Sequence, residues 1–502
     1  MLTTLVVVPL VAALLMALLG RIGHEANARR VGIGAALAVV AATVRAWFSF
    51  DLQASGFQFV ERAAWLPAFG ADYHLAVDGI SLVLVSLTAC LTLMVLLASW
   101  HSRDRYPVGR DAAVLVIEAA CLAAFTARDL LLFYVSAEVM ILPMCALVGI
   151  WGRGRRVYAS MRFLLFSLTA SGLTLLAILW IAWRHQVATG IWTFAVQDLL
   201  AIDMPAGTQS WAFLALAVAF AIRMPVFPFH TWFADALAQA PASGGVMLVG
   251  CVVNVAGYGL VRYAFPLLPD AAATAAPWLA MIAVIGILHG AFVAIGQDDL
   301  RRVVASVTVS HMGLVVLGVS ALTVDSIQGA LFHLVAHGAW SAGLLIVIGM
   351  LAARRQTTRM SDFGGLRLVV PGLSLAWLVM TTAAIGIPGA PGLVGTVRSL
   401  AGAAASPSLG YGLLLAVTAG AGMIVAGVCM LRAFWRVSLG PITSDRNRGL
   451  RDVAGVERVV LIPVCLMVIA IGVWPSPLLA VIEPAALAAL VEILGATLSI
   501  GP

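Results

Sequence analysis

The chain has 502 residues, of which 62% are hydrophobic and only 10% charged, with a formal net charge of +6. No soluble fold can cover so many apolar side chains with a polar surface, so the composition excludes a water-soluble protein and places the chain in a lipid bilayer. All 29 basic residues are arginines, which stay charged at physiological pH, whereas a buried lysine can release its proton.

Apolar runs long enough to cross the hydrocarbon core follow one another along almost the whole chain. They predict an all-α integral membrane protein with about fourteen transmembrane helices, at approximately 2–20, 31–50, 78–100, 111–127, 129–151, 158–183, 209–229, 242–264, 276–296, 302–321, 325–352, 370–403, 408–436 and 456–480. The first run lacks the basic start of a signal peptide and is followed by further spans, so we interpret it as the first membrane helix. A last run, 475–500, predicts an apolar or interfacial helix, because Glu483 and Glu492 argue against a deep span.

Arginines gather in alternate loops, which predicts that these loops face the cytoplasm. They are Arg21, Arg29, Arg30, Arg103, Arg105, Arg110, Arg153, Arg155, Arg156, Arg301, Arg302, Arg354, Arg355, Arg359, Arg367, Arg436, Arg446, Arg448 and Arg451. The opposite loops carry mostly acids, namely Asp51, Glu61, Asp198, Asp203, Asp270 and Asp325. We therefore expect a multi-pass protein of a bacterial inner membrane with both termini outside the cytoplasm.

Two spans contain helix breakers at membrane depth, Pro225 with Pro228 and Pro388 with Pro391. Each break frees backbone groups that lipid cannot satisfy, so each should be buried in protein or line water. Interrupted helices at corresponding places in two halves of a chain are typical of transporters built from inverted repeats. The alternative is a pair of proline kinks accommodated by packing.

Ionisable side chains inside membrane spans are costly, so each is a candidate functional residue. The candidates are Glu118, Glu138, Arg223, His289, His311, His333 and His337. Glu138 and Arg223 are expected to form a buried ion pair, of either functional or purely structural role. His333 and His337 are four residues apart and share one helix face, where they can pass protons.

No motif for a bound cofactor is present. The six cysteines, Cys90, Cys121, Cys145, Cys251, Cys429 and Cys465, lie in apolar runs without metal-ligand spacing. No glycine-rich phosphate loop, dinucleotide fingerprint or haem attachment motif occurs. We expect no metal and no cofactor in this chain, and any redox group should belong to a partner.

Several motifs in this order resemble the M subunit of NADH-quinone oxidoreductase, complex I. They are Val77-Asp-Gly-Ile-Ser81, Leu97-Ala-Ser-Trp100, Asp129-Leu-Leu-Leu-Phe-Tyr134, Gly149-Ile-Trp-Gly152, Pro228-Phe-His-Thr-Trp232, Ser310-His-Met-Gly313, Ile327-Gln-Gly-Ala330 and Phe363-Gly-Gly-Leu366. The resemblance covers about residues 70 to 400. It implies fourteen helices in two inverted five-helix repeats, each with a broken helix, in a proton-translocating subunit driven by quinone reduction elsewhere.

The resemblance sets expected boundaries within one polytopic domain, 1–502. The N-terminal helices occupy 1–110, the first repeat 111–264, the second repeat 276–436 and the C-terminal helices 456–502.

Three positions depart from the family pattern. Arg223 and Asn254 stand where the family has lysines, and Thr396 stands where it has a glutamate. Neither Asn nor Thr can carry a proton, so the usual relay is interrupted unless His289 and His333 compensate. The proton path implied by the resemblance and the titratable residues consists of Glu118, Glu138, Arg223, His230, Asn254, His289, His311, His333, His337 and Thr396.

The expected function is that of a membrane-arm subunit that couples electron transfer in partner subunits to proton movement. The expected partners are the lipid bilayer, other membrane subunits of a complex I-like assembly and, through those subunits, a quinone; no nucleic acid is expected. One alternative is a structural spacer that has lost translocation, which Asn254 and Thr396 suggest. Another is a subunit of a cation/proton antiporter or of an inorganic carbon transporter.

Overall fold

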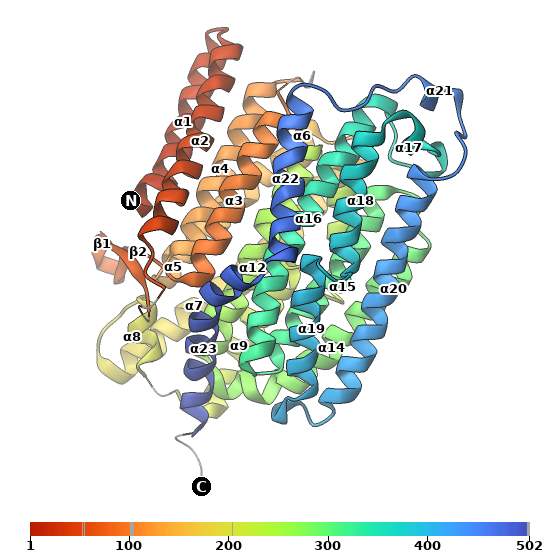
Figure 1. Ribbon diagram of the computed structural model, residues 1–502. Coiled ribbons are helices and arrows are strands. Elements are labelled where there is room, and N and C mark those ends of the chain that lie inside the picture. The colour runs from red at the N-terminus through yellow and green to blue at the C-terminus, as the bar shows by residue number, and fades with distance from the viewer. Residues whose placement is uncertain (53, 55, 101–104, 203, 499–502) are drawn as a thin grey trace.

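The computed structural model describes residues 1–52, 54, 56–100, 105–202 and 204–498, and it is helical almost throughout (Figure 1). Arg103 and Asp203, named above in the expected topology, lie outside the described residues. The N-terminal part consists of α1 (Leu2–Arg21), α2 (Glu25–Ser49), β1 (Gln58–Leu66), η1 (Pro67–Phe69), β2 (Ala71–Val77) and α3 (Gly79–Ala98).

Two series of helices follow. The first is α4 (Pro107–Thr126), α5 (Leu130–Val139), α6 (Ile141–Trp151), α7 (Arg156–Thr189), α8 (Val196–Leu200), α9 (Ala206–Arg223), α10 (Thr231–Gln239), α11 (Ala242–Met247), η2 (Leu248–Val252), α12 (Val253–Gly259), η3 (Leu260–Ala264) and α13 (Phe265–Leu267). The second is α14 (Pro269–Ile295), α15 (Leu300–Ser320), α16 (Val324–Arg355), η4 (Met360–Asp362), α17 (Leu366–Val369), α18 (Pro371–Ile385), α19 (Pro391–Ala404), η5 (Pro407–Leu409) and α20 (Gly412–Ser438). The chain continues with α21 (Asp445–Arg448), α22 (Val456–Val473) and α23 (Ser476–Leu498).

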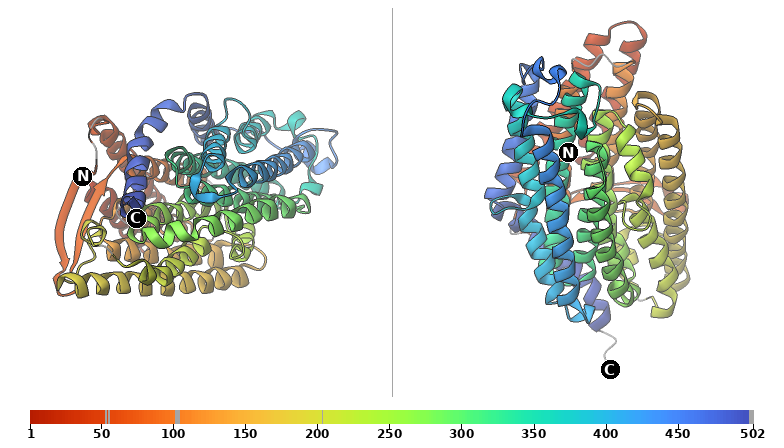
Figure 2. Two further views of the ribbon diagram at one scale, coloured as in Figure 1. Left: turned by 90° about the horizontal axis from the view of Figure 1, so that it is seen from below. Right: turned by 90° about the vertical axis from the view of Figure 1, so that its right-hand side faces the viewer.

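The all-α membrane fold is confirmed. In the part of the chain that the structure describes, 12 helices are long and apolar enough to cross a membrane. Helix α4 and the two interrupted helices α9–α10 and α18–α19 are not among these 12, but they pack between them. Figure 2 shows the long helices packed side by side, with the second series beside the first. Each expected span corresponds to one helix or to consecutive helices, and in both series the interrupted helix comes fourth.

Several expected boundaries were wrong; α14, for example, begins at Pro269 rather than near residue 276. Helix α2 begins at Glu25, so Arg29 and Arg30 lie within a helix rather than in a loop. The expected span 129–151 is divided at Met140 into α5 and α6, one turn before Pro143, which has no N–H to continue the helix. Segment 58–77, for which no structure was expected, forms an antiparallel hairpin of β1 and β2.

The hairpin holds the start of α1 through Glu61. Its carboxylate accepts hydrogen bonds from the backbone N–H groups of Leu2 and Thr3, at 2.8 and 2.9 Å, and pairs with the amino group of Met1. Burial raises the pKa of Glu61, but the hydrogen bonds from the amino group, the Thr3 hydroxyl and the two N–H groups outweigh it and lower the pKa to about 2. The contact therefore depends on an ionised carboxylate.

A pH-dependent stability is expected from this contact. Because the folded pKa lies below the ordinary value of 4.5, the contribution of Glu61 is present above pH 4.5 and is lost as the pH falls toward 2. Thermal unfolding of the Glu61→Gln variant should show a deficit of about 1 kcal/mol or less at pH 6, which narrows at pH 3. The exposed Glu483 offers the control, and an equal deficit in Glu483→Gln would contradict the assignment.

Both breaks in membrane helices are satisfied by protein groups. At the first break, between α9 and α10, the Trp232 indole N–H donates to the carbonyl of Ile222 at 2.9 Å, and the N–H of Val226 donates to Ala221 at 2.8 Å. At the second, between α18 and α19, Gly386 has a φ of 76°, a left-handed conformation that ends α18 with little strain. The two prolines of each pair lie in the break or at its end.

Helix α22 covers the second break at close range. A side chain at Gly472 would collide with the carbonyl of Gly389, since an added Cβ would meet it at 2.4 Å. Only glycine lets the two backbones approach this closely.

The centre of the bundle consists of the segment from α11 to α13 together with α15 and α16, whose side chains are almost entirely buried. Two turns of this central segment, η2 and η3, are π-helical and flank α12. Such turns are rare and often occur at functional sites.

The C-terminal α23 packs against α3, α14 and α16. It is long and apolar enough to cross a membrane, so its interfacial position stays a prediction. Helix α23 runs to the end of the bundle that lies opposite α17 and α21 (Figure 1).

Candidate functional site

The first break carries an ion pair. Arg223, the last residue of α9, pairs with Glu138 on α5. Ser171 on α7 bridges both, because its hydroxyl donates to Glu138 Oε2 at 2.5 Å and accepts from Arg223 Nη2 at 3.0 Å. The side chain of Glu138 is 24% exposed and that of Arg223 is 12% exposed, so the pair is partly buried. Three helices thus place one carboxylate, one guanidinium and one hydroxyl together.

A small cavity of about 20 Å³ lies beside this pair, lined by Arg223, Ser167 and the apolar side chains around them. That volume holds one water molecule. Val255 and Ala256 of α12 form its opposite wall, so the cavity connects the pair to the helix that carries Asn254.

Asn254 lies at the centre, fully buried on α12 between the two π-helical turns. Its Nδ2 donates to the carbonyl of Gly250 at 2.9 Å, while its Oδ1 accepts no hydrogen bond within the described residues. It abuts α16 at Gly338, where an added Cβ would lie 2.9 Å from Asn254 Nδ2. Asn254 therefore lies against Gly338, the residue that follows His337.

Three histidines form a buried cluster next to Asn254. His311 Nδ1 lies 2.8 Å from His333 Nε2, with the two rings stacked, and the ring centroids of His311 and His337 are 5.4 Å apart. His337 Nε2 contacts the Thr308 hydroxyl at 3.2 Å, and Trp340 packs against the rings of His311 and His337. Within the described residues, the Nδ1 atoms of His333 and His337 have no hydrogen-bond partner.

The histidine cluster reaches the second broken helix. An added Cβ on Gly395 of α19 would lie 3.0 Å from His333 Nδ1. Thr396, the next residue, is half-buried. Polar side chains thus stand at the first break, at Asn254 and in the histidine cluster beside the second break, whereas the cavity between Arg223 and α12 is lined mostly by apolar side chains.

His230 and His289 form a separate couple. His230 ends the first break, His289 lies on α14, and their Nε2 atoms are 3.1 Å apart. Both are half-buried, and Phe227 packs against both rings.

Glu118 does not join the ion pair. It is fully buried on α4, and neither of its carboxylate oxygens has a hydrogen-bond partner among the residues that the structure describes. Thr92 of α3 lies beside it.

Two parts of the site were not predicted from the sequence. Ser171 went unnoticed, although Ser167, Ser171 and Thr174 recur at helical spacing and predict one polar stripe along α7. The structure buries all three. The π-helical turns around Asn254 had no recognised signal.

A helical bundle with two interrupted helices, and with titratable side chains between them, defines a membrane subunit of the ion-translocating, antiporter-like class. The profile of the NADH:quinone oxidoreductase/Mrp antiporter transmembrane family matches residues 127–423. The chain belongs to this family.

Curated relatives agree with the assignment. The chain is 33% identical to NADH-quinone oxidoreductase subunit M of Rickettsia bellii over 439 residues, which is 87% of each chain. It is 34% identical to the subunit of the same name from Escherichia coli over 421 residues, 83% of this chain and 82% of that one.

Solved structures share the fold. A chain of respiratory complex I from Thermus thermophilus matches with a TM-score of 0.88 and 27% identity, over 98% of this chain and 100% of the other. A chain of the Mrp complex from Dietzia sp. matches with a TM-score of 0.85 over 100% and 99%, and at 21% identity it supports the fold alone.

Proposed function

We propose that this chain is a proton-translocating membrane-arm subunit of a complex I-like respiratory assembly. Partner subunits transfer electrons to a quinone, and this chain moves protons without a cofactor of its own. The observation that supports the proposal best is the presence of three buried or partly buried polar groups between the two broken helices: the Glu138–Arg223 pair, Asn254, and the cluster of His311, His333 and His337. Subunit M relatives of nearly equal length support the choice of assembly.

In this proposal the histidines carry the titration. Arg223 keeps the positive charge beside Glu138 but cannot release a proton at physiological pH. Imidazole can accept a proton at one nitrogen while donating from the other. Asn254 then orients a hydrogen-bonded water rather than holding charge.

A second candidate function is a structural spacer that has lost translocation. It is favoured by Asn254 and Thr396, which cannot titrate, and by the small cavity beside Arg223, whose lining does not include Asn254. A two-partner ion or inorganic-carbon transporter remains the alternative of a different class. Genes for other complex I membrane subunits beside this one would exclude it.

Proton flux in liposomes that contain the purified complex tests the main proposal. Electron transfer to quinone should drive proton uptake with a stoichiometry that falls when this subunit is inactivated by substitution. An unchanged stoichiometry in all such variants would support the spacer.

The proposed orientation predicts where tags are accessible. Arg355 bonds Asn447 at 2.7 Å at one end of the bundle, and Gln209 bonds Asp270 at 2.9 Å at the other. Reporter tags after Arg105, Arg355 or Arg446 should be cytoplasmic, and tags near Asp203 or Asp270 should be outside, because arginine-rich loops stay inside. Reversal of either set would refute this orientation in a bacterial inner membrane.

A further inference from the structure

A second, much larger cavity opens at the arginine-rich end of the bundle. Its volume is about 910 Å³, within the range of ligand-binding pockets. Its walls come from the ends of α3 and α6 and the start of α4 on one side, and from α11, α15, α16 and α22 on the other. We call it the vestibule. It is distinct from the path between the two broken helices.

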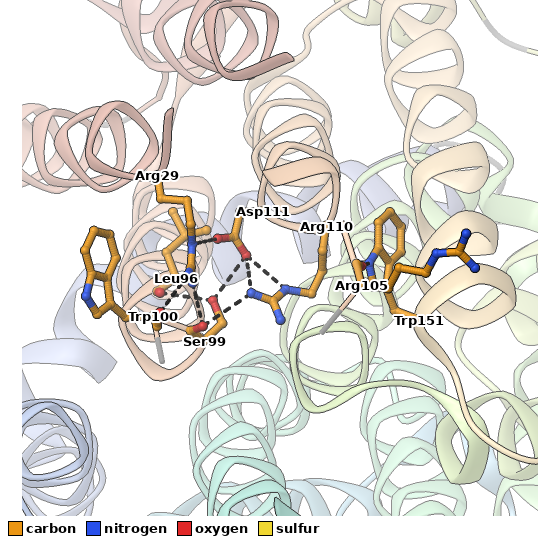
Figure 3. A network of polar contacts seen from close by, with 8 residues as sticks. All are labelled: Arg29, Leu96, Ser99, Trp100, Arg105, Arg110, Asp111 and Trp151. Atoms are coloured by element: carbon orange, nitrogen blue, oxygen red, sulfur yellow. Dashed lines mark hydrogen bonds and ion pairs between the residues drawn. The ribbon is translucent and has the colours of Figure 1, made fainter. Parts of the chain in front are cut away.

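Behind one wall of the vestibule, two arginines meet at Asp111 (Figure 3). Arg29 and Arg110 approach this carboxylate from two sides, at 2.9 Å to Oδ2 and 2.8 Å to Oδ1, and the Ser99 hydroxyl donates to Oδ1 at 3.1 Å. Arg110 is only 1% exposed, yet it lines the vestibule. Two guanidinium groups share this carboxylate, and Arg110 places one of them in the wall of the vestibule.

Two more arginines face the same space. Arg301, 6% exposed, is anchored by the backbone carbonyl of Ala240, and Arg153 comes from the loop after α6. The acidic residue in the lining, Glu457, is ion-paired with Arg354 at 2.6 Å. Among the described residues of the lining, the arginines therefore outnumber the acids.

One hydroxyl in the vestibule lacks a partner. Ser243 lines it and is 8% exposed, and its Oγ makes no hydrogen bond within the described residues. A buried polar group without a partner is unfavourable, and a ligand oxygen would satisfy it. Val95, Val246 and Ile346 give the vestibule an apolar part as well.

From these observations we infer that the vestibule binds a phosphate-bearing anion. Guanidinium groups present several N–H donors that match phosphate oxygens, and enclosure strengthens the attraction. The phosphate comes either from the headgroup of an anionic phospholipid, whose chains would follow the apolar part, or from a soluble phosphate compound. The bound anion joins the two series of helices, since its walls belong to both.

Thermal unfolding of the full-length chain in nanodiscs tests this inference, with two probes. One is phosphatidylglycerol, titrated into phosphatidylcholine nanodiscs; the other is inorganic pyrophosphate, added to nanodiscs of phosphatidylcholine alone. At least one of the two ligands should raise the melting temperature of the native chain, because a ligand that binds the folded state stabilises it. Stabilisation by the lipid alone identifies a headgroup site, and stabilisation by pyrophosphate identifies a soluble ligand.

Matched variants separate the vestibule from general charge effects. Arg153→Gln should shift the midpoint of the ligand titration by about tenfold, the effect of losing one charge-assisted hydrogen bond. Arg155→Gln, in the same loop but outside the lining of the vestibule, should leave this midpoint unchanged.

Ser243→Phe, which fills the vestibule, should abolish the rise in melting temperature. If this variant does not fold, the comparison of Arg153→Gln with Arg155→Gln decides. No stabilisation by either probe, or equal midpoints in both arginine variants, would overturn the inference. The result is independent of proton translocation.

Discussion

Replacement of Glu138 by Gln is expected to reduce coupled proton flux by roughly tenfold, because the variant leaves the charge of Arg223 without its partner. Removing one member of a fully buried pair costs about 3–5 kcal/mol. Here Glu138 is 24% exposed and Arg223 is 12% exposed, so the cost of removing one partner should be nearer to about 1–3 kcal/mol. Each 1.4 kcal/mol corresponds to about a factor of ten. Flux is measured in liposomes with the assembled complex, together with its thermal stability.

Two further variants decide whether the pair is functional or only structural. Glu118→Gln should have the smaller effect, since Glu118 takes part in no ion pair among the described residues. The double variant Glu138→Gln with Arg223→Gln removes both charges and should recover stability. If it also recovers flux, the pair is a structural salt bridge. If flux stays low while stability returns, the charges themselves take part in translocation.

The sequence was sufficient for the parts of the fold that depend on local composition. Runs of apolar residues predicted the spans, and Pro225 and Pro388 predicted the breaks, because proline removes a backbone donor wherever it lies inside a helix. The pairing of Glu138 with Arg223 followed from the high cost of leaving either charge alone in a membrane. The structure brings these two residues together.

Other features depend on contacts between distant segments and could not be predicted in this way. The hairpin has little local signal, and it is fixed by its contacts with α1 and with the segment around Asp129, whose carboxylate accepts from the N–H of Asp72 at 3.1 Å. The vestibule joins residues from α3, α11, α16 and α22. The stacking of His311 on His333 requires the relative rotation of α15 and α16, and helical spacing alone cannot give it.

The histidine cluster leads to the prediction that separates a translocating subunit from a spacer. His333→Gln keeps a side chain of similar size that can still hydrogen-bond His311, but it removes a group that can take up and release a proton. If the histidines have replaced the missing lysine, flux should fall roughly 10²–10⁴-fold, the usual contribution of a positioned proton-transfer group. His185→Gln is the control, because this histidine is also buried but bonds the carbonyl of Ile191 at the end of α7.

The reciprocal experiment restores the family's charged residues by Asn254→Lys together with Thr396→Glu. Asn254 abuts Gly338 closely, so the lysine must extend toward the Arg223 cavity or toward the histidines to be accommodated. If the native chain already moves protons through His333, the double substitution should add little flux, and His333→Gln should abolish what the native chain shows. If the native chain shows no flux and the double variant gains it, the chain is a spacer, and its buried histidines serve packing and hydrogen bonding. Flux that is present in the native chain and unaffected by His333→Gln would exclude the histidine route, and translocation would then have to depend on Glu138 and on water beside Arg223.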